Sequence, residues 1–358
     1  MNKKHAGILL FTVWAVLLGV VLTVMGTVPG APALSYGAAR LQVDIPSRLL
    51  QLSIPALPSF SQSTEEKTDP QEEESPSTEP ETEPPDPAPE PEPEPDSEPP
   101  EGSLPVISKT YSSGLGINNS SSLKLDIDEL LAHIPDIPIE KDDGPQILIL
   151  HTHATESYND DNLDYYTGGS PRSEENYANV VHMGTILEKI LTDAGYSVIH
   201  SQVQHDNPDF NQSYTNSNLT IRHYLELYPS ISVVIDLHRD SLVDNSGTKY
   251  RPVVEIDGVK TAQVMLLMGV GNATYVHKNW KENLSLAMRI QKKGEDLYQG
   301  LMRPVLVRPS RYNQHLCNGS ILVELGACGN SPAEAEQAAR CFGDILVQTL
   351  NDLKEERK

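Results

Sequence analysis

Four consecutive aliphatic residues, 147–150, are followed at once by the polar residues His151, Thr152 and His153, and Glu156 comes three positions later. A short apolar run that ends this abruptly is typical of a buried, parallel strand. In open α/β sheets, ligands bind just beyond the carboxyl ends of such strands. Two histidines and a carboxylate so close together therefore predict a metal or acid–base site, although a lone histidine there is usually a hydrogen-bonded loop residue.

Composition limits the classes of protein to which the chain can belong. Its 358 residues are enough for one or two domains, and its net charge of -23 argues against nucleic acid as a partner, because no basic stripe is present to meet phosphates. The three cysteines, Cys317, Cys328 and Cys341, are too few for a disulfide framework and match no zinc-binding spacing. We interpret them as buried thiols.

The first 27 residues predict a membrane anchor. Lys3 and Lys4 precede an apolar, uncharged stretch at 6–25, and about 20 such residues span a bilayer as a helix. A cleaved signal peptide is the alternative, but the run is long for one and the candidate cleavage site at 31–33 contains a proline. We therefore expect a single-pass protein of the cytoplasmic membrane, with residues 1–27 as cytoplasmic tip and anchor and the rest of the chain outside.

Three further segments follow the anchor. Residues 28–60 form a weakly apolar juxtamembrane segment, and residues 61–105 are almost entirely Pro, Glu, Ser, Thr and Asp. The second segment has almost nothing to bury, which explains the low apolar content of the whole chain, and we expect a disordered acidic linker. An extended chain of this kind reaches up to ~140 Å at ~3.1 Å per residue. Residues 106–358 are expected to fold as the catalytic domain.

The folded part predicts an α/β protein with a twisted, mostly parallel sheet flanked by helices. The strand at 147–150, an amphipathic helix at 174–194 and a strand at 196–199 form one βαβ unit. Two later strands, 232–237 and 320–323, are followed by His238 and Glu324. The remaining expected elements are helices at 219–228, 279–298 and 331–350, a short strand at 305–307, and a hairpin-like pair at 253–256 and 261–268 with its turn at 257–258.

Three strands of this sheet are thus expected to carry His153, His238 and Glu324 to one edge. Catalytic zinc needs about three His or carboxylate ligands and an open position for water, whose proton a nearby unligated Glu accepts. The two histidines and a carboxylate supply the ligands, and Glu324 supplies the base. The alternative is that Glu324 is a core carboxylate hydrogen-bonded to the backbone.

A series of motifs resembles one known family. The motifs are residues 151–158 (HTHATESY), 179–181 (NVV), 236–240 (DLHRD), 277–283 (HKNWKEN), 311–315 (RYNQH), and Glu324 with Asn330. Their order is similar to that in the stage II sporulation protein P family, membrane-anchored peptidoglycan hydrolases of endospore-forming Firmicutes that act in engulfment. The resemblance covers roughly residues 145–352. More distantly, the domain resembles the zinc-dependent N-acetylmuramoyl-L-alanine amidases, which implies an amidase-like fold.

The resemblance to the amidases implies that His153 and His238 bind Zn²⁺ and that Glu324 is catalytic. It leaves His151 as a residue beside the ligands or on the substrate side, which we count with Glu324 in the catalytic group. The third ligand stays open between Glu156 and Glu175, with a slight preference for Glu156. The expected substrate-binding residues are Arg239, Arg311, Asn313 and His315, of which Arg311 and His315 are equally compatible with a structural role.

The same resemblance implies two activities on peptidoglycan: amide cleavage between the glycan and its stem peptide, and endopeptidase cleavage of cross-links. It also implies a partner, the lytic transglycosylase sporulation protein D, within an engulfment complex at the septal membrane between forespore and mother cell. The alternative from another class is a catalytically inactive cell-wall binding or scaffold protein on the same fold. A metallophosphoesterase-like hydrolase is weaker, because only Asp236 and Asp240 are well placed for two metals.

Overall fold

The computed structural model describes residues 99–139, 144–160 and 163–358, all of which belong to the second of two units into which the chain divides, Gln62–Lys358. The predicted anchor, the juxtamembrane segment and nearly all of the linker lie outside these residues. Among the helices that are described, none combines the length and the apolar character needed to cross a bilayer.

The centre of the fold is a seven-stranded sheet with the order β2-β10-β9-β11-β6-β3-β5. In that order its strands span Ile117–Asn119, Val305–Arg308, Val264–Gly269, Gly319–Ala327, Val233–Asp240, Ile147–Leu150 and Val198–His200. β11, β6, β3 and β5 are parallel, as the sequence predicts. The expected βαβ unit is confirmed, because β3 and β5 pair and are connected through α3 (Val180–Asp193).

The other half of the sheet runs in the opposite direction, so the sheet is mixed. β9 pairs antiparallel with β11, and β10 and β2 follow the direction of β9. A parallel neighbour needs a crossover connection, which α5 (Trp280–Leu297) provides between β9 and β10. β9 itself follows a hairpin directly, with only residue 263 between them, and enters the sheet without a crossover helix.

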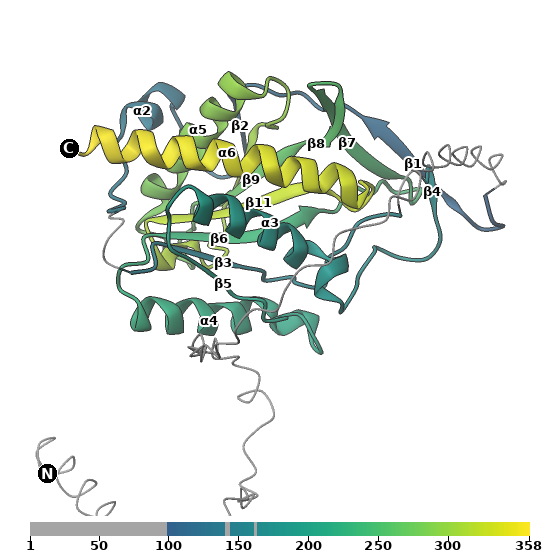
Figure 1. Ribbon diagram of the computed structural model, residues 1–358, viewed down its shortest axis with the longest axis horizontal. Coiled ribbons are helices and arrows are strands. Elements are labelled where there is room, and N and C mark those ends of the chain that lie inside the picture. The colour runs from purple at the N-terminus through teal and green to yellow at the C-terminus, as the bar shows by residue number, and fades with distance from the viewer. Residues whose placement is uncertain (1–98, 140–143, 161–162) are drawn as a thin grey trace, which may run out of the picture. The chain divides into compact units, whose positions relative to one another are not determined.

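Helices cover both faces of this sheet. α3, α5 and α6 (Pro332–Glu356) lie against one face, and α4 (Ser213–Leu227) lies against the other (Figure 1). Ile147 and Ile149 of β3 belong to the larger core on the first face, whereas Leu148 and Leu150 pack in a smaller cluster that includes Ile221 of α4. The uninterrupted apolar run of β3 is explained by this burial on both sides.

A second, four-stranded sheet has the order β4-β1-β7-β8. These strands span Tyr165–Tyr166, Leu104–Lys109, Lys249–Ile256 and Val259–Ala262. The expected hairpin is present as β7 and β8, and both turn residues, Asp257 and Gly258, have the positive φ that such a tight turn requires. The expected partner strand at 261–268 is divided, because the side chain of the fully buried Gln263 is held by Tyr111 and Gly300 between β8 and β9.

Two smaller predictions can also be compared with the structure. The three cysteines are buried free thiols, as expected. The helix expected at 174–194 begins only at Val180, because the Asn179 side chain accepts a hydrogen bond from the Val181 amide and caps the helix there. The preceding residues form a short 3₁₀ turn at Asn176–Ala178, which leaves Glu175 outside the helix.

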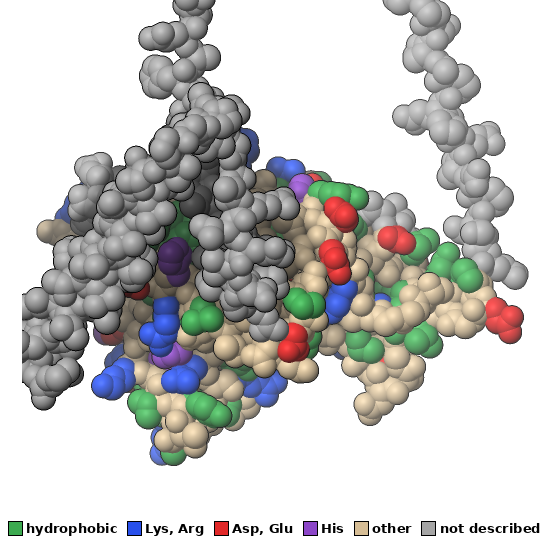
Figure 2. Space-filling view, turned by 90° about the horizontal axis from the view of Figure 1, so that it is seen from below, with side chains coloured by type: hydrophobic (Ala, Val, Ile, Leu, Met, Phe, Trp, Pro, Cys, Tyr) green, Lys and Arg blue, Asp and Glu red, His purple; other side chains and the backbone are tan. Residues whose placement is uncertain are grey.

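The side of the molecule that carries α4 is uneven in charge. Figure 2 shows several Lys and Arg side chains gathered around a histidine on one part of this side, with the acidic side chains displaced toward the other end. For a chain with 50 acidic and 27 basic residues, a local gathering of cations is unexpected.

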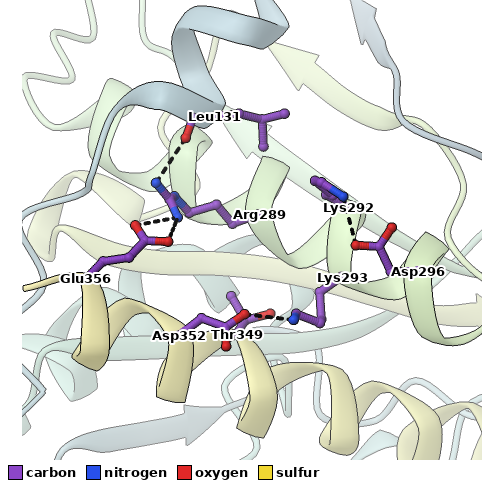
Figure 3. Close-up of a pocket in the computed structure, with 8 residues that line it drawn as sticks. All are labelled: Leu131, Arg289, Lys292, Lys293, Asp296, Thr349, Asp352 and Glu356. Carbon is purple, nitrogen blue, oxygen red and sulfur yellow. Dashed lines mark hydrogen bonds and ion pairs between the residues drawn. The ribbon is translucent and has the colours of Figure 1, made fainter.

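A pocket of about 310 Å³ lies between the C-terminal halves of α5 and α6, next to Leu131 of α2 (Ile127–Ala132) (Figure 3). Its charges are paired with one another: Arg289 with Glu356, Lys292 with Asp296, and Lys293 with Asp352. α6 begins just after β11 and has 25 residues, a length of about 37 Å. The pocket is therefore at the opposite edge of the sheet from the predicted site.

A pair of leucines provides a test of this core. Leu346 on α6 is fully buried, and Leu219 on α4 is 64% exposed. We expect Leu346→Ala to lower the free energy of unfolding by about 2–5 kcal/mol, because it removes buried methyl groups and leaves a cavity. Leu219→Ala should change the same quantity by about 0.5 kcal/mol or less. Denaturant unfolding of the two variants measures the difference, and equal losses would contradict the packing described.

Candidate metal and catalytic site

The three strands predicted to carry the site are neighbours. β6 lies between β3 and β11, and Glu324 on β11 stands directly opposite His238 on β6. Both strands extend further than the sequence suggested, so these two residues lie within strands and not just after them. Their side chains therefore project from the α4 face of the sheet, near its edge, and not from the edge itself.

His238 is held between two carboxylates. Its Nε2 lies 2.9 Å from Asp236 Oδ1 and its Nδ1 lies 3.4 Å from Glu156 Oε2. The Asp236 carboxylate accepts hydrogen bonds from the backbone amide and the hydroxyl of Thr152, which fixes its orientation. Burial favours the neutral imidazole, but the two carboxylates outweigh it and raise the pKa of His238 well above its usual range.

His153 has a nitrogen without a partner. Its ring stacks on Phe210 with centroids 4.4 Å apart and meets the ring of His238 edge-on at 5.4 Å. Its Nδ1 is buried and makes no hydrogen bond with any residue that the structure describes; the nearest acidic oxygen among them is Asp206 Oδ2, at 4.0 Å. Burial, followed by repulsion from His238, lowers the pKa of His153 to about 4. The ring is therefore neutral near pH 7, which is the state that binds metals.

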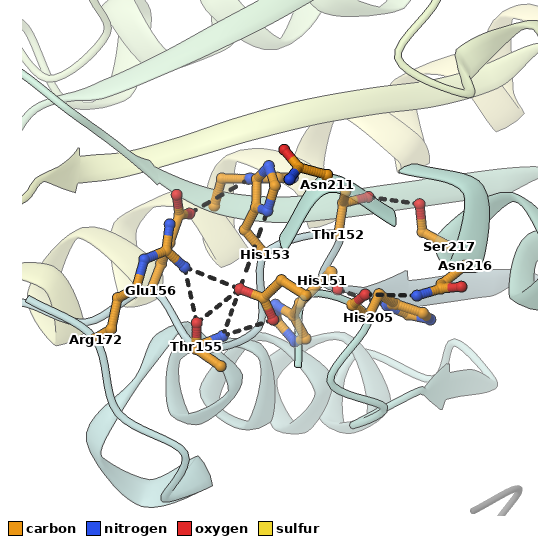
Figure 4. A network of polar contacts seen from close by, with 12 residues as sticks. His151, Thr152, His153, Thr155, Glu156, Arg172, His205, Asn211, Asn216 and Ser217 are labelled. Atoms are coloured by element: carbon orange, nitrogen blue, oxygen red, sulfur yellow. Dashed lines mark hydrogen bonds and ion pairs between the residues drawn. The ribbon is translucent and has the colours of Figure 1, made fainter. Parts of the chain in front are cut away.

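Glu156 is the carboxylate that the fold brings to the histidines (Figure 4). Arg239 donates its backbone amide to Glu156 Oε2, and its guanidinium lies 3.5 Å from Oε1. Burial alone would raise the pKa of this carboxyl, but His238 and Arg239 lower it to about 2. Glu175 is exposed before the 3₁₀ turn and makes no side-chain contact with any described site residue. The structure brings together Glu156, and not Glu175, with His238.

Glu324 is 9% exposed, and its Oε2 has no hydrogen-bond partner among the described residues. The alternative of a core carboxylate satisfied by the backbone is therefore not what the structure contains. Burial, followed by the charge of Asp240, raises the pKa of Glu324 to about 8. A buried carboxyl of this kind is costly and is expected where its proton affinity is used.

His151 is directed away from these groups. Its ring is fully buried, Nδ1 is 3.0 Å from the Leu237 carbonyl oxygen, and Nε2 shares a hydrogen bond of 2.9 Å with Nε2 of His200. His200 in turn contacts Glu188 on α3. Both nitrogens of His151 are occupied in this way, so the structure does not bring it together with His153, His238 and Glu324.

Arg239 makes several contacts within the protein. Its guanidinium is buried and donates to the carbonyl oxygens of Ser157 and Pro171 and to the hydroxyl of Ser170, in addition to its contact with Glu156. The contacts with Ser157, Ser170 and Pro171 hold the loop that follows β3. Arg239 thus positions Glu156 from a buried place, and its contact with substrate stays a prediction.

The loop at 311–315 borders the site through Tyr214, whose ring contacts His153. The Asn313 side chain donates to the Tyr214 carbonyl oxygen and to Ser217 on α4, and the Tyr214 ring lies edge-on to His153. Arg311 lies over the ring of Tyr275 at 5.4 Å. Asn313 therefore fixes the loop to α4, and Arg311 and His315 remain candidates for substrate contact.

Two carboxylates of the site were not identified as such from the sequence. Asp206 accepts hydrogen bonds from the amide and hydroxyl of Thr155 and pairs with Arg172 at 2.9 Å. Asp236 was considered only for a rival metal site. One signal was available for Asp236, because residues two apart on a strand share a face, which places it beside His238. Asp206 lies in a loop after β5, and no local pattern marks it.

The donor chemistry of these residues fits zinc. His153, His238 and Glu156 are the nitrogen and oxygen ligands typical of catalytic zinc, and the separation of 3.4 Å between His238 Nδ1 and Glu156 Oε2 is close to the roughly 3.3 Å expected between two ligands of one tetrahedral ion. Asp236 supports His238 as an outer carboxylate commonly supports a ligating histidine. No group of three His, Cys, Asp or Glu is gathered closely enough to hold a metal among the described residues as they stand.

The structure is thus an α/β fold with a mixed sheet, and His238 and Glu324 lie side by side on one face of that sheet. The family model for stage II sporulation protein P matches residues 46–347. This match covers most of the chain, which therefore belongs to the stage II sporulation protein P family. The stage II sporulation protein P of Bacillus subtilis (strain 168) is 27% identical over 223 residues, which is 59% of this chain and 52% of that protein. The chain thus aligns with about half the length of that curated relative.

Several solved structures were also found to be similar. An N-acetylmuramoyl-L-alanine amidase, AmiC2 of Nostoc punctiforme, is 14% identical, covers 60% of this chain and 99% of its own, and has a TM-score of 0.36. The corresponding amidase from Clostridium difficile 630 is 12% identical, covers 60% of this chain and 100% of its own, and has a TM-score of 0.37.

A buried histidine near the site provides a test of pH dependence. His277 is 4% exposed, and burial, with His315 and Arg311 nearby, lowers its pKa from 6.5 to about 4. Between these values the unfolded chain binds more protons than the folded one, so the free energy of unfolding falls as the pH drops. His277→Asn should remove up to about 3 kcal/mol of this fall.

Urea unfolding at several pH values between 4 and 7.5 measures the effect. The difference between variant and wild type at pH 7.5 serves as the reference, because it contains the packing change without the proton-linked part. Parallel curves for the two proteins across the whole range would contradict a depressed pKa at His277.

Proposed function

We propose that this chain is a zinc-dependent peptidoglycan hydrolase of endospore formation that cleaves the amide bond between the glycan and its stem peptide. Membership of the stage II sporulation protein P family supports the sporulation and cell-wall context. The observation that carries the proposal is the unpartnered carboxylate of Glu324 beside His238. A protein that only binds the wall gains nothing from a buried, uncompensated carboxyl, which costs stability.

His153, His238 and Glu156 are the proposed ligands. When bound, zinc supplies a Lewis acid that polarises the scissile carbonyl and makes water more acidic. The protein prepares the donors in advance: Asp236 and Thr152 orient His238, and Arg239 holds Glu156 through its backbone amide and its guanidinium. His153 contributes its unpartnered Nδ1.

Glu324 is the proposed general base and then general acid. When zinc is bound, its positive charge would favour the carboxylate form that accepts the proton, and burial, which raises the pKa of Glu324, favours the protonated form that follows. Burial thus lets the protonated carboxyl hold the proton until the leaving amine nitrogen receives it. Each transfer needs Glu324 on the same face as His238, which the register of β11 and β6 provides.

The finer features of the proposal come from the sequence. The apolar stretch at 6–25 supports a membrane anchor, and the acidic linker at 61–105 supports a catalytic domain held at a distance from the bilayer. The resemblance of the motifs supports endopeptidase cleavage as a second activity, a role in engulfment, and sporulation protein D as a partner. The alternative is a scaffold protein with the same fold and no activity.

The assignment of the third ligand can be tested by metal content. We expect the full chain, purified in detergent, to contain one zinc per molecule, and we expect Glu156→Ala to lose most of it because one of three protein donors is removed. Glu175→Ala is the matched control and should retain its zinc. Measurement by atomic emission decides between them, and the opposite pattern would assign the third ligand to Glu175.

The role of Glu324 can be tested separately from metal binding. Glu324→Gln should retain zinc and release stem peptides from purified sacculi roughly 10²- to 10⁴-fold more slowly, because the amide cannot transfer a proton. Glu255→Gln, an exposed substitution of the same kind on β7, is the control and should leave the rate unchanged. Wild-type protein that contains zinc but releases nothing from sacculi would favour the inactive scaffold.

A further inference from the structure

Two histidines outside the proposed zinc site have ring nitrogens without partners. His277 lies in the loop after β9 and His315 in the loop after β10, with ring centroids 6.3 Å apart. Neither nitrogen of the buried His277 makes a hydrogen bond within the described part of the chain, and the same holds for Nδ1 of His315. Buried polar groups of this kind are rare in folded proteins and call for an explanation.

The charges around these rings are positive. Burial is the largest cause that lowers the pKa of each imidazole. His315 and Arg311 lower the pKa of His277 further, and Arg311 and Arg222 of α4 do the same for His315. The Arg311 guanidinium is partly exposed and lies over the Tyr275 ring. Of the ion pairs between described residues, none involves Arg311. The cluster therefore lacks a negative partner from the described part of the protein.

The two loops are fixed in place before any ligand arrives. Val270 donates its amide to the Arg308 carbonyl oxygen, and Gly271 donates to that of Ser310. Gln314 joins the loops further, since its side chain accepts from the Gly269 amide and donates to the Leu267 carbonyl oxygen. A rigid arrangement of donors lowers the ordering cost of binding.

Backbone conformation supports the same view. Tyr312 and Asn313 have φ values of 46° and 57°, which places two successive residues with side chains in the left-handed region. This conformation costs energy and is found preferentially at binding and catalytic sites.

Aromatic rings connect the loop that carries Arg311 with the proposed zinc site. The Tyr214 ring is edge-on to His153 at 5.6 Å on one side and 6.0 Å from the Tyr312 ring on the other, and Tyr312 follows Arg311 directly. Because β9 and β10 run opposite to β6 and β11, the loops after them begin at the other edge of the sheet, and the loop at 311–315 reaches toward the site across the α4 face. A substrate that extends from His153 along α4 would meet this loop.

We propose that Arg311, His277 and His315 form a carboxylate-binding subsite, which holds an acidic group of the stem peptide at a distance from the bond that is cleaved. The identification of the peptide rests on the proposed function; the preference for a carboxylate does not. A guanidinium binds carboxylates through two parallel N–H groups, and imidazole nitrogens supply further donors. Neighbouring arginines oppose a metal cation here.

Calorimetric titration of the full chain with Glu324→Gln, which is expected to prevent cleavage of the probes, tests the subsite without turnover, and the variants below are made in this background. The probes are N-acetylmuramoyl-L-alanyl-D-glutamate, its diamide, and inorganic phosphate. We expect the dicarboxylate to bind measurably, the diamide to bind roughly 10- to 100-fold more weakly, and Arg311→Gln to weaken the dicarboxylate by a similar factor, because a charge-assisted contact is lost. Arg340→Gln, on the exposed side of α6, is the matched control and should bind as Glu324→Gln alone does.

A second variant guards against misfolding. His277→Asn keeps a polar side chain of similar reach and should also weaken the dicarboxylate while the far-ultraviolet circular dichroism stays unchanged. Equal binding of the dicarboxylate and the diamide, or an effect of Arg340→Gln as large as that of Arg311→Gln, would overturn the proposal. Phosphate binding more tightly than the dicarboxylate would overturn it as well, in favour of a phosphate site. Because binding is measured directly, failure of the hydrolase assignment would appear separately, as absent release from sacculi with intact dicarboxylate binding.

Discussion

The carboxylate of Asp236 is the interaction on which the rest of the site depends. It joins two strands by accepting hydrogen bonds from Thr152 at the end of β3 while its other contact holds His238 on β6. The segment after β3 that begins with Thr152 also carries His153 and Glu156, so this one group sets the relative position of all three proposed ligands. A buried carboxylate can act in this way because several donors compensate its desolvation.

Much of this arrangement could be predicted from the sequence. Abrupt changes from apolar to polar residues marked β3, β6 and β11, and the parallel geometry of α/β sheets explains why residues far apart in the chain meet. The antiparallel entry of β9 could not be predicted, because a single polar residue, Gln263, within the strand-like segment 261–268 does not mark a break between two strands. Strand direction follows from connections in space, which local patterns do not record.

The directions in which side chains point could not be predicted from the sequence, and this limited the prediction of the site. His151 and His153 follow the same strand two residues apart, so the sequence alone does not distinguish their orientations. In the structure, the His151 side chain lies next to α3 and the His153 side chain faces α4, because the chain leaves the extended conformation after β3. Arg239 was expected to face substrate but is buried by the loop that it holds. The sequence does not indicate whether a long cationic side chain next to a histidine points toward substrate or into the protein. Glu156 was favoured over Glu175, and its neighbours in the structure agree with that preference.

The reversal of strand direction at β9 separates the proposed metal ligands from the proposed carboxylate-binding residues within one sheet. The proposed ligands come from β6 and the segment after β3, whereas Arg311 and His315 come from the loop after β10, in the half that runs the other way. That loop crosses the α4 face and is fixed there by Asn313. Its length and composition can therefore diverge among related proteins without disturbing the strands that hold the chemistry.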